Sequence, residues 1–344
     1  MPIDRRRALA FAGAAALAAC SRHKLSNAPN TKPMDTHRLD REFPALAQRA
    51  APGAFALGVM DLQTTAAWFW NTEHGFPLAG AAAAPIAAAA LARVDAGQLP
   101  LAQWVSYDAL DLSPPPSLIA ADWPTPPDKR VASIAVPDLF RLALREDDST
   151  AMDVLMKQVG GPGAVGAFLE QKGVLGLRID RYQREIAVAL EGMPTFRAAW
   201  KDPASFDAER DTLPAPARQA AMDAYILDPR DTATAPAALG FLAMLAAGDL
   251  VSPASTAQLL AWMETAPGGL FAPGLPSGVR VAHATGAALV DLGYEPAMTE
   301  LAIATFAPNR RYALAGFLVG STATAAGRAG LFADAARLAA TAIG

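Results

Sequence analysis

The chain has 344 residues, a net charge of −4, 52% hydrophobic residues and 18% charged residues. This composition supplies enough apolar side chains for a sizeable core, and the length allows one large or two ordinary domains. An acidic balance with no basic run beyond the N-terminus argues against nucleic-acid binding, and a single cysteine, Cys20, excludes an intramolecular disulfide.

The N-terminus predicts an export signal. Arg5, Arg6 and Arg7 precede an apolar run, residues 8–19, which is too short to span a bilayer as a stable helix. The arginine cluster resembles a twin-arginine signal, although the residues after it match loosely. We therefore expect an exported, periplasmic protein.

The apolar run ends in the letters L-A-A-C, and its last residue is Cys20. This ending resembles the lipobox of bacterial lipoproteins, which implies cleavage and lipidation at Cys20. An ordinary signal peptide with an incidental cysteine is the alternative. We expect residues 1–20 to be a signal peptide with a lipobox and residues 21–36 to be a flexible tether, so that a lipid anchor is the sole link to a membrane.

Beyond the tether, hydrophobic periodicity predicts strands near both ends and helices between them. A strand hairpin, a helical middle, then three strands and a helix predict an α+β fold with one antiparallel sheet covered by helices. The final helix is expected to pack beside the first. Residues 113–127 contain six prolines and predict a loop. The expected helices are 37–51, 81–94, 134–144, 149–158, 234–248, 252–265 and 331–343, and the expected strands are 54–59, 66–70, 279–282, 301–306 and 312–319.

The stretch 73–97 predicts a turn followed by a long buried helix. Residues 81–94 contain no glycine and are mostly alanine, the best helix former. Pro85 is tolerated only near the first turn, so the helix should begin close to Gly80. A helix with almost no polar atoms must be buried inside a domain.

The same stretch resembles the active-site helix of the class A serine β-lactamases. Residues 76–77, F-P, match the front of the pattern F-P-x-x-S-x-x-K, and residues 92–97, A-R-V-D-A-G, match the end of its helix. The register puts Gly80 at the position of the nucleophilic serine and Ala83 at that of the lysine. Neither replacement can attack a carbonyl or move a proton. The resemblance covers about residues 38–343 and implies an α/β/α sandwich plus an all-helical subdomain within a domain of residues 37–344.

A second segment, residues 147–153, reads D-D-S-T-A-M-D and resembles the family pattern S-D-N-T-A-x-N. The resemblance puts Asp147 at the position of a proton-shuttling serine and Ser149 at that of an asparagine that holds the substrate amide. Asp148 matches an aspartate with a scaffolding role. From the residues alone, Asp147 and Asp148 can instead cap the helix that begins near Ser149.

The third family pattern, R-x-E-x-E-L-N, corresponds to R-Y-Q-R-E-I-A at residues 181–187. Gln183 replaces the general base and cannot take a proton from water, and Ala187 replaces an asparagine that helps to hold that water. The resemblance also implies that Arg181 pairs with Asp231 and closes the neck of the loop between them. The general base is lost, whereas the pair at the loop neck is kept.

The last family pattern is K-T-G, and here it reads Ala284-Thr285-Gly286, without the lysine. Thr285 can donate a hydrogen bond to a ligand, and Gly286 allows close approach of the backbone. His283 is the nearby side chain able to titrate near neutrality, but a lone histidine at a strand end is more often a surface residue than a catalytic one. The candidate binding residues are Asp147, Ser149, Gln183, His283, Thr285 and Gly286.

One feature is an addition to the family pattern. Residues 188–227 form a 40-residue insertion (227 − 188 + 1 = 40) in the omega loop that borders the family's cleft. The insertion contains helix-like runs at 195–201 and 215–224, and we expect it to cover or narrow the cleft. Its aromatic residues are Phe196, Trp200, Phe206 and Tyr225.

Together, the substitutions at Gly80, Ala83, Gln183 and Ala284 remove two positive charges and one negative charge, and Asp147 adds a negative charge. The cleft should therefore be neutral or acidic and should repel the carboxylate of a β-lactam. Loss of a nucleophile and its base typically lowers the rate by about 10⁶-fold.

Three interpretations follow. The favoured one is a catalytically inactive lipoprotein, a monomer without metal or cofactor, that binds a small ligand or an envelope protein; it predicts an aromatic patch or a cleft plugged by Phe196 or Trp200. The second is an enzyme with different chemistry, in which Asp147 or Asp148 acts as the acid or base because two adjacent carboxylates can hold one proton; it predicts an open pocket at which Asp147, Thr285 and His283 converge. The third is a β-lactamase with residual activity, which needs a nucleophile that the sequence does not offer.

Overall fold

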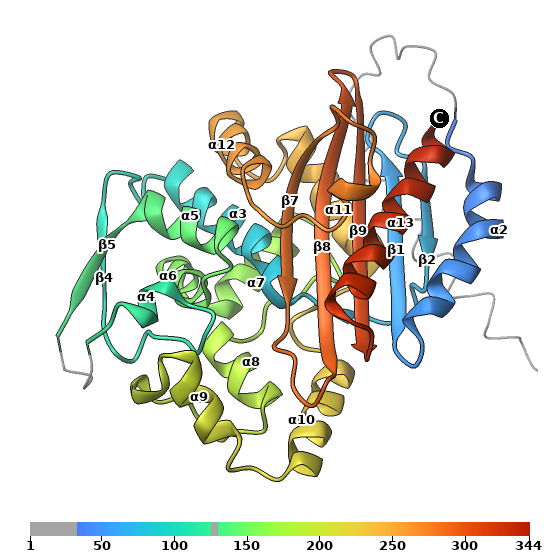
Figure 1. Ribbon diagram of the computed structural model, residues 1–344. Coiled ribbons are helices and arrows are strands. Elements are labelled where there is room, and N and C mark those ends of the chain that lie inside the picture. The colour runs from blue at the N-terminus through green and yellow to red at the C-terminus, as the bar shows by residue number, and fades with distance from the viewer. Residues whose placement is uncertain (1–32, 125–129) are drawn as a thin grey trace, which may run out of the picture. The chain divides into compact units, whose positions relative to one another are not determined.

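A five-stranded antiparallel sheet, in the order β2-β1-β9-β8-β7, forms the central layer of the fold (Figure 1). The structure is a computed structural model that describes residues 33–124 and 130–344. The predicted signal peptide with Cys20, and most of the predicted tether, lie outside the described residues. The strands are β1 (Ala54–Asp61), β2 (Ala67–Trp70), β7 (Arg280–Ala287), β8 (Glu295–Ala307) and β9 (Arg310–Ser321).

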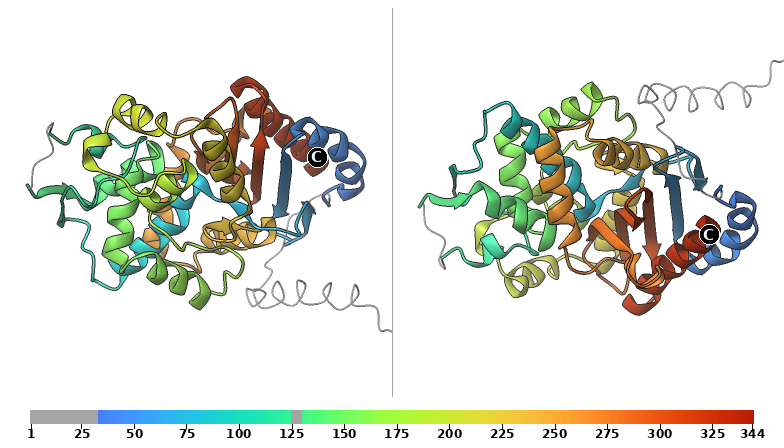
Figure 2. Two further views of the ribbon diagram at one scale, coloured as in Figure 1. Left: turned by 90° about the horizontal axis from the view of Figure 1, so that it is seen from below. Right: turned by 90° about the horizontal axis from the view of Figure 1, so that it is seen from above.

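Two helices, α2 (Thr36–Ala47) and α13 (Ala325–Ile343), cover one face of this sheet and lie side by side (Figures 1 and 2). Aromatic rings join them to β1: the ring centroid of Phe55 lies 5.8 Å from that of Phe43 and 5.1 Å from that of Phe332. The predicted pairing of the first and last helices is confirmed.

Helix α11 (Ala235–Ala247) covers the opposite face of the sheet. It approaches β1 closely at Gly58, where an added Cβ would lie 2.9 Å from the side chain of Leu239. A sheet between two helical layers confirms the predicted α+β, α/β/α arrangement.

The remaining helices pack around α3 and form the predicted all-helical region (Figure 1). A two-stranded ribbon of β4 and β5 projects beside it, and a short pair of β3 and β6 joins the two regions. These elements are α3 (Ala83–Asp95), α4 (Leu118–Ala121), α5 (Val136–Arg145), α6 (Ser149–Val159), α7 (Pro162–Gln171), α8 (Gln183–Leu190), α12 (Pro253–Glu264), β3 (Phe76–Pro77), β4 (Trp104–Tyr107), β5 (Ala132–Ala135) and β6 (Thr232–Ala233), with 3₁₀ turns at Gln48–Ala50, Ala79–Ala82, Ala198–Trp200 and Ala272–Gly274.

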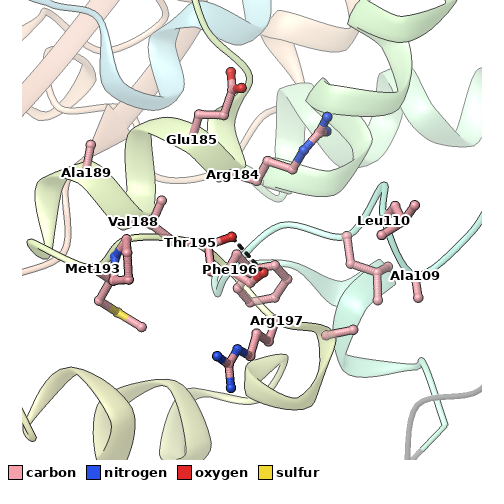
Figure 3. Close-up of a pocket in the computed structure, with 13 residues that line it drawn as sticks. Ala109, Leu110, Arg184, Glu185, Val188, Ala189, Met193, Thr195, Phe196 and Arg197 are labelled. Carbon is pink, nitrogen blue, oxygen red and sulfur yellow. Dashed lines mark hydrogen bonds between the residues drawn. The ribbon is translucent and has the colours of Figure 1, made fainter.

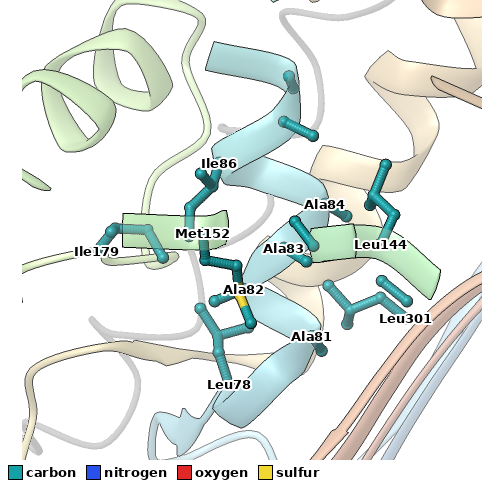
Figure 4. Close-up of a cluster of buried hydrophobic side chains, with 14 of the residues drawn as sticks. Leu78, Ala81, Ala82, Ala83, Ala84, Ile86, Leu144, Met152, Ile179 and Leu301 are labelled. Carbon is teal, nitrogen blue, oxygen red and sulfur yellow. The ribbon is translucent and has the colours of Figure 1, made fainter. Parts of the chain in front are cut away.

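The predicted central helix is confirmed as α3, preceded by the 3₁₀ turn η3 (Ala79–Ala82). Pro85 is the third residue of α3, so its missing N–H removes no intrahelical hydrogen bond. Every residue from Ala83 to Leu91 is buried. Small alanine side chains let Met152, Leu144 and neighbouring apolar residues approach the helix on several sides (Figure 4). Close packing of this kind fixes the position of η3.

Three local predictions are wrong. Residues 113–127 are not a loop throughout, because Ser117 caps the short helix α4 by accepting a hydrogen bond from the N–H of Ala120 at 3.0 Å. Ile134 belongs to β5 rather than to the helix that follows. In the insertion, the run 195–201 is helical only in the 3₁₀ turn η4 (Ala198–Trp200).

The insertion contains two further helices, α9 (Pro203–Arg210) and α10 (Ala215–Leu227). The prediction for 215–224 is confirmed by α10. Helix α9 was not predicted, although Asp202 at its N-cap and Pro203 at its first position are standard start signals. Within the described residues, no helix has the length and apolarity needed to cross a bilayer.

Candidate functional site

Gly80 lies in the η3 turn at the N-terminal end of the buried central helix. Strand β7 packs directly against the backbone of this turn. A Cβ at Gly286 of β7 would lie 2.6 Å from the backbone nitrogen of Ala81, so only glycine fits at 286. The preceding residue, Ala79, has φ of 46°, a left-handed conformation that non-glycine residues rarely adopt. Strained backbone of this kind persists where the surrounding packing holds it, often at ligand sites.

The carboxyl group of Asp147 occupies the space in which a side chain at residue 80 would begin. A Cβ added to Gly80 would lie 2.5 Å from Cγ and 2.6 Å from Oδ2 of Asp147. Asp147 also has a positive φ, 52°. Within residues 33–124 and 130–344, its side chain forms no hydrogen bond or ion pair. Burial, and to a lesser degree the nearby charge of Asp148, raise the pKa of Asp147 to about 8.

Asp148 is the N-cap of helix α6. Its Oδ1 accepts hydrogen bonds from the N–H of Ala151 at 2.8 Å and the hydroxyl of Ser117 at 3.0 Å, and its Oδ2 accepts from the N–H of Ile119 at 3.0 Å. The side chain therefore joins α6 to α4. The capping alternative holds for Asp148 and is wrong for Asp147, whose carboxyl group points to Gly80 instead.

Ser149 and Gln183 line the same hollow as Asp147 and Gly80. The Ser149 hydroxyl donates to the carbonyl oxygen of Pro116 at 3.1 Å. Gln183 begins α8, and its backbone N–H donates to Oδ1 of Asp153 at 2.6 Å. The first contact positions the Ser149 hydroxyl and the second fixes the backbone of Gln183, but neither residue is ionisable, so neither can serve as a general base.

Arg181 and Asp231 join the two ends of the loop that contains the insertion. Nε of Arg181 donates to Oδ2 of Asp231 at 2.6 Å, and Oδ1 of Asp231 accepts from the backbone N–H groups of Arg181 at 3.0 Å and Asp180 at 2.7 Å. Asp228 lies 3.3 Å from a second guanidinium nitrogen of Arg181. Since both Arg181 and Asp231 are buried, the ion pair has a low-dielectric environment.

His283 and Thr285 face each other on β7. Nδ1 of His283 lies 3.0 Å from Oγ1 of Thr285, and Nε2 lies 3.0 Å from the carbonyl oxygen of Ala266. A carbonyl oxygen can only accept, so Nε2 carries the proton and the Thr285 hydroxyl donates to Nδ1. Burial lowers the pKa of His283, which favours this neutral form. His283 is buried rather than on the surface.

The hollow beside Gly80 has a volume of only about 60 Å³. That space holds about two water molecules, at roughly 30 Å³ each, and ligand pockets usually measure about 300 to 1,000 Å³. Leu190 and Tyr225 from the insertion, together with Leu289 from the segment after β7, narrow it. The insertion therefore covers this hollow, but Phe196 and Trp200 do not line it, and their expected role as plugs is wrong.

The second interpretation expected an open pocket at which Asp147, Thr285 and His283 converge. The structure does not bring them together, because neither Thr285 nor His283 lines the hollow that contains Asp147. Of the predicted binding residues, Asp147, Ser149 and Gln183 share the hollow, whereas Gly286 supports it from behind through its contact with η3.

A larger hollow lies on the other side of α8, and sequence reasoning missed it. Its volume is about 710 Å³, and it is lined by residues 109–112, by α8 and by residues 193–198 of the insertion (Figure 3). The described residues contain no group of three or more His, Cys, Asp or Glu side chains that could hold a metal ion.

The profile of the beta-lactamase enzyme family matches residues 38–343. This chain belongs to that family. The class A beta-lactamase of the last common ancestor of Gram-negative bacteria is 27% identical, with a TM-score of 0.69 over 89% of this chain and 99% of its own. A second structure titled as an ancestral class A beta-lactamase is 27% identical, with a TM-score of 0.67 over 87% of this chain and 98% of its own. A beta-lactamase from Chitinophaga pinensis, 23% identical over 88% of this chain and 99% of its own, shares the fold with a TM-score of 0.68.

Within the beta-lactamase family fold, the four substituted positions of the sequence comparison lie around the N-terminal end of α3. Ala83 and Ala284 are buried apolar residues, 2% and 1% exposed. Gly80 offers no side chain, and Gln183 lies across the hollow. The class A resemblance implies a serine, two lysines and a glutamate at these positions; here none of the four residues present can ionise.

Proposed function

We propose that this beta-lactamase-family protein is non-catalytic and binds a small ligand or a protein of the cell envelope. The single observation that carries the proposal is the carboxyl group of Asp147, which fills the space next to Gly80 where the family resemblance implies a nucleophile. Acyl transfer needs a nucleophile, a base within hydrogen-bond reach and space for the reacting carbonyl.

The chemistry of the hollow supports the proposal. Its hydroxyl groups belong to Ser149 and Tyr225, and its lining residues include no lysine or histidine. The Ser149 hydroxyl donates a hydrogen bond to a backbone carbonyl, and burial raises the pKa of Tyr225 above its ordinary value, so that the phenol stays protonated at neutral pH. A volume of about 60 Å³ is far below the roughly 300 to 1,000 Å³ of ordinary ligand pockets.

Acid–base chemistry at Asp147 is the competing function, because a carboxyl group with a pKa of about 8 can donate a proton at neutral pH. Such an enzyme would need the insertion to move away from the hollow, since Leu190 and Tyr225 cover it. Ser149 and Gln183, the other polar side chains of the hollow apart from Tyr225, would then have to orient the substrate.

The deciding measurement is hydrolysis of a chromogenic cephalosporin by the purified protein that begins at Ser21, combined with intact-mass analysis for an acyl adduct. A class A beta-lactamase serves as positive control. We expect neither turnover nor adduct. Turnover abolished by Asp147→Asn would instead establish acid–base chemistry at Asp147, and turnover that survives this substitution would point to an unrecognised nucleophile.

We further propose that the protein is exported to the periplasm and anchored by a lipid on Cys20, on the strength of the sequence pattern L-A-A-C after an apolar run. Metabolic labelling with a palmitate analogue should mark the wild-type protein and leave Cys20→Ser unlabelled. Equal labelling of both proteins, or of neither, would contradict lipidation at Cys20.

A further inference from the structure

The insertion and α8 together build a groove that is separate from the hollow beside Gly80. Its volume, about 710 Å³, lies within the range of clefts that bind small molecules. The walls are mainly apolar and come from two segments far apart in the sequence, residues 109–112 and residues 184–198 (Figure 3). The apolar lining residues include Ala109, Leu110, Leu112, Val188, Met193 and Phe196.

Leu110 forms part of one wall of this groove and is 83% exposed to solvent. Another wall is held by buried packing, because Val188 and Met193 form a small apolar cluster with Phe206 of α9. An exposed leucine beside a firm apolar wall can gain contacts when an apolar ligand arrives.

Arg197 supplies a positive charge at the edge of the groove. Its guanidinium lies 5.1 Å from the centre of the Trp200 ring, and within the described residues it forms no hydrogen bond or ion pair. A guanidinium that stacks on an aromatic ring keeps its N–H donors free for a carboxylate or phosphate.

The other charged groups of the groove already have partners. Arg184 lies 3.3 Å from the buried carboxylate of Asp153 and stacks over the ring of Tyr182. Glu185 accepts a hydrogen bond from the N–H of Tyr182 at 2.9 Å. Figure 3 shows both side chains on α8, on the opposite side of the groove from Arg197. Arg197 is therefore the charged side chain of the groove that is available to pair with a ligand.

We propose that this groove binds a small amphipathic anion, with an apolar body against Leu110, Val188 and Phe196 and a carboxylate or phosphate at Arg197. The proposal deepens the binding function proposed above and rests on it. It does not involve Gly80 or Asp147, so the groove and the hollow can be tested separately.

The test uses the purified full-length protein and anilinonaphthalene sulfonate, an apolar aromatic anion whose fluorescence rises on binding. Three competitors share one ten-carbon chain: decanoate, decanol and decyltrimethylammonium. A charge-assisted hydrogen bond is roughly twice as strong as one between neutral groups, so we expect decanoate to displace the dye at a concentration about tenfold lower than decanol. The cationic competitor should be weaker still.

Arg197→Gln should reduce the preference for decanoate over decanol to about twofold or less, because the amide cannot pair with a carboxylate as an ion. Arg41→Gln, a change at an exposed arginine of α2 outside the groove, should keep the full preference. Leu110→Ser should weaken decanoate and decanol to the same extent.

Equal displacement by decanoate and decanol in the wild-type protein would overturn the proposal, as would an unchanged preference in Arg197→Gln. Failure of all three competitors would also overturn it. The cephalosporin assay, repeated on the full-length protein, keeps the two proposals distinct, because hydrolysis would refute the non-catalytic function without altering the displacement result.

Discussion

The carboxyl group of Asp147 occupies the space that a side chain at residue 80 would need: a Cβ at residue 80 would lie 2.5 Å from Cγ of Asp147. The two residues are therefore sterically coupled, although 66 residues lie between them in the sequence. A substitution at either position is expected to change the space available to the residue at the other.

Gly80→Ala should destabilise the protein, because the new methyl group collides with Asp147 and overpacking of a buried site costs about 1 to 3 kcal/mol. The double variant Gly80→Ala with Asp147→Gly should recover most of this loss, since glycine suits the positive φ at 147. Thermal unfolding of the two single variants and the double variant measures the coupling.

Gly240→Ala provides the matched control for this pair. Gly240 lies within α11, and nothing is within 4 Å of a Cβ added there. Alanine is about 1 kcal/mol better than glycine inside a helix, so this variant should melt no lower than the wild-type protein. A Gly80→Ala variant as stable as Gly240→Ala would show that the space beside Asp147 is not filled.

Arg181→Ala should loosen the neck of the insertion loop. Removal of one partner from a buried ion pair typically costs about 3 to 5 kcal/mol, and Asp231 would lose the bond from Nε at 2.6 Å. Arg178→Ala is the control, because Arg178 pairs with Asp180 at the surface, where ion pairs contribute about 0 to 1 kcal/mol. Equal melting temperatures for the two variants would argue against the stabilising role of Arg181.

Stability should fall as the pH rises from 5 to 8. Burial raises the pKa of Asp147 and Glu300 to about 8 and those of Glu191 and Glu295 to about 7. These carboxyl groups ionise in the unfolded chain near pH 4 to 4.5, so the unfolded state releases protons first as the pH rises. The stability they provide is complete below about pH 4 and is lost as the pH passes through 7 to 8.

Melting temperatures measured at pH 5, 6.5 and 8 test this dependence. Glu300→Gln should flatten the slope, because it removes a buried group that must ionise inside the protein. Glu73→Gln, a change at an exposed carboxylate, should leave the slope as in the wild-type protein. A melting temperature that increases toward pH 8 would refute the assigned directions.

Arg218→Ala should loosen the packing of the insertion against the turn that contains Asp291. Nε of Arg218 on α10 lies 3.4 Å from Oδ2 of Asp291, in the turn between β7 and β8, and both side chains are largely buried. Loss of this contact, together with the ion pair between Arg218 and Asp211, should raise the rate of limited proteolysis within residues 188–227. Arg280→Ala, at an exposed arginine paired with Glu264, is the control. Identical cleavage of both variants would show that this contact does not hold the insertion.

The sequence was sufficient to predict the fold where apolar periodicity and start signals agree. The alanine run before Leu91 predicts α3, and Ser252 with Pro253 predicts the start of α12 at the residue where it begins. The β4–β5 ribbon was not predicted, because Val105 is the one buried residue among the four of β4. A strand stabilised mainly by its partner gives little periodic signal.

The site was only partly predictable, for a physical reason. The pairing of Arg181 with Asp231 follows from the family pattern, but the position of the Asp147 side chain depends on its positive φ and on the space at Gly80. No local sequence signal encodes that combination. Likewise, the choice of Leu190 and Tyr225 over Phe196 and Trp200 as the covering residues depends on how the insertion folds back across α8.

The contact between the first and last helices bears on the connectivity of the fold. The backbone N–H of Asp35 donates to the carbonyl oxygen of Ala342 at 2.8 Å, and Arg49 pairs with Asp334 at 2.6 Å. Because the two ends of the folded unit lie next to each other, a short linker could join them, and new termini could be opened in the exposed turn at Asp211–Thr212. Such a circular permutant would divide the insertion while the sheet and both helical layers stay continuous.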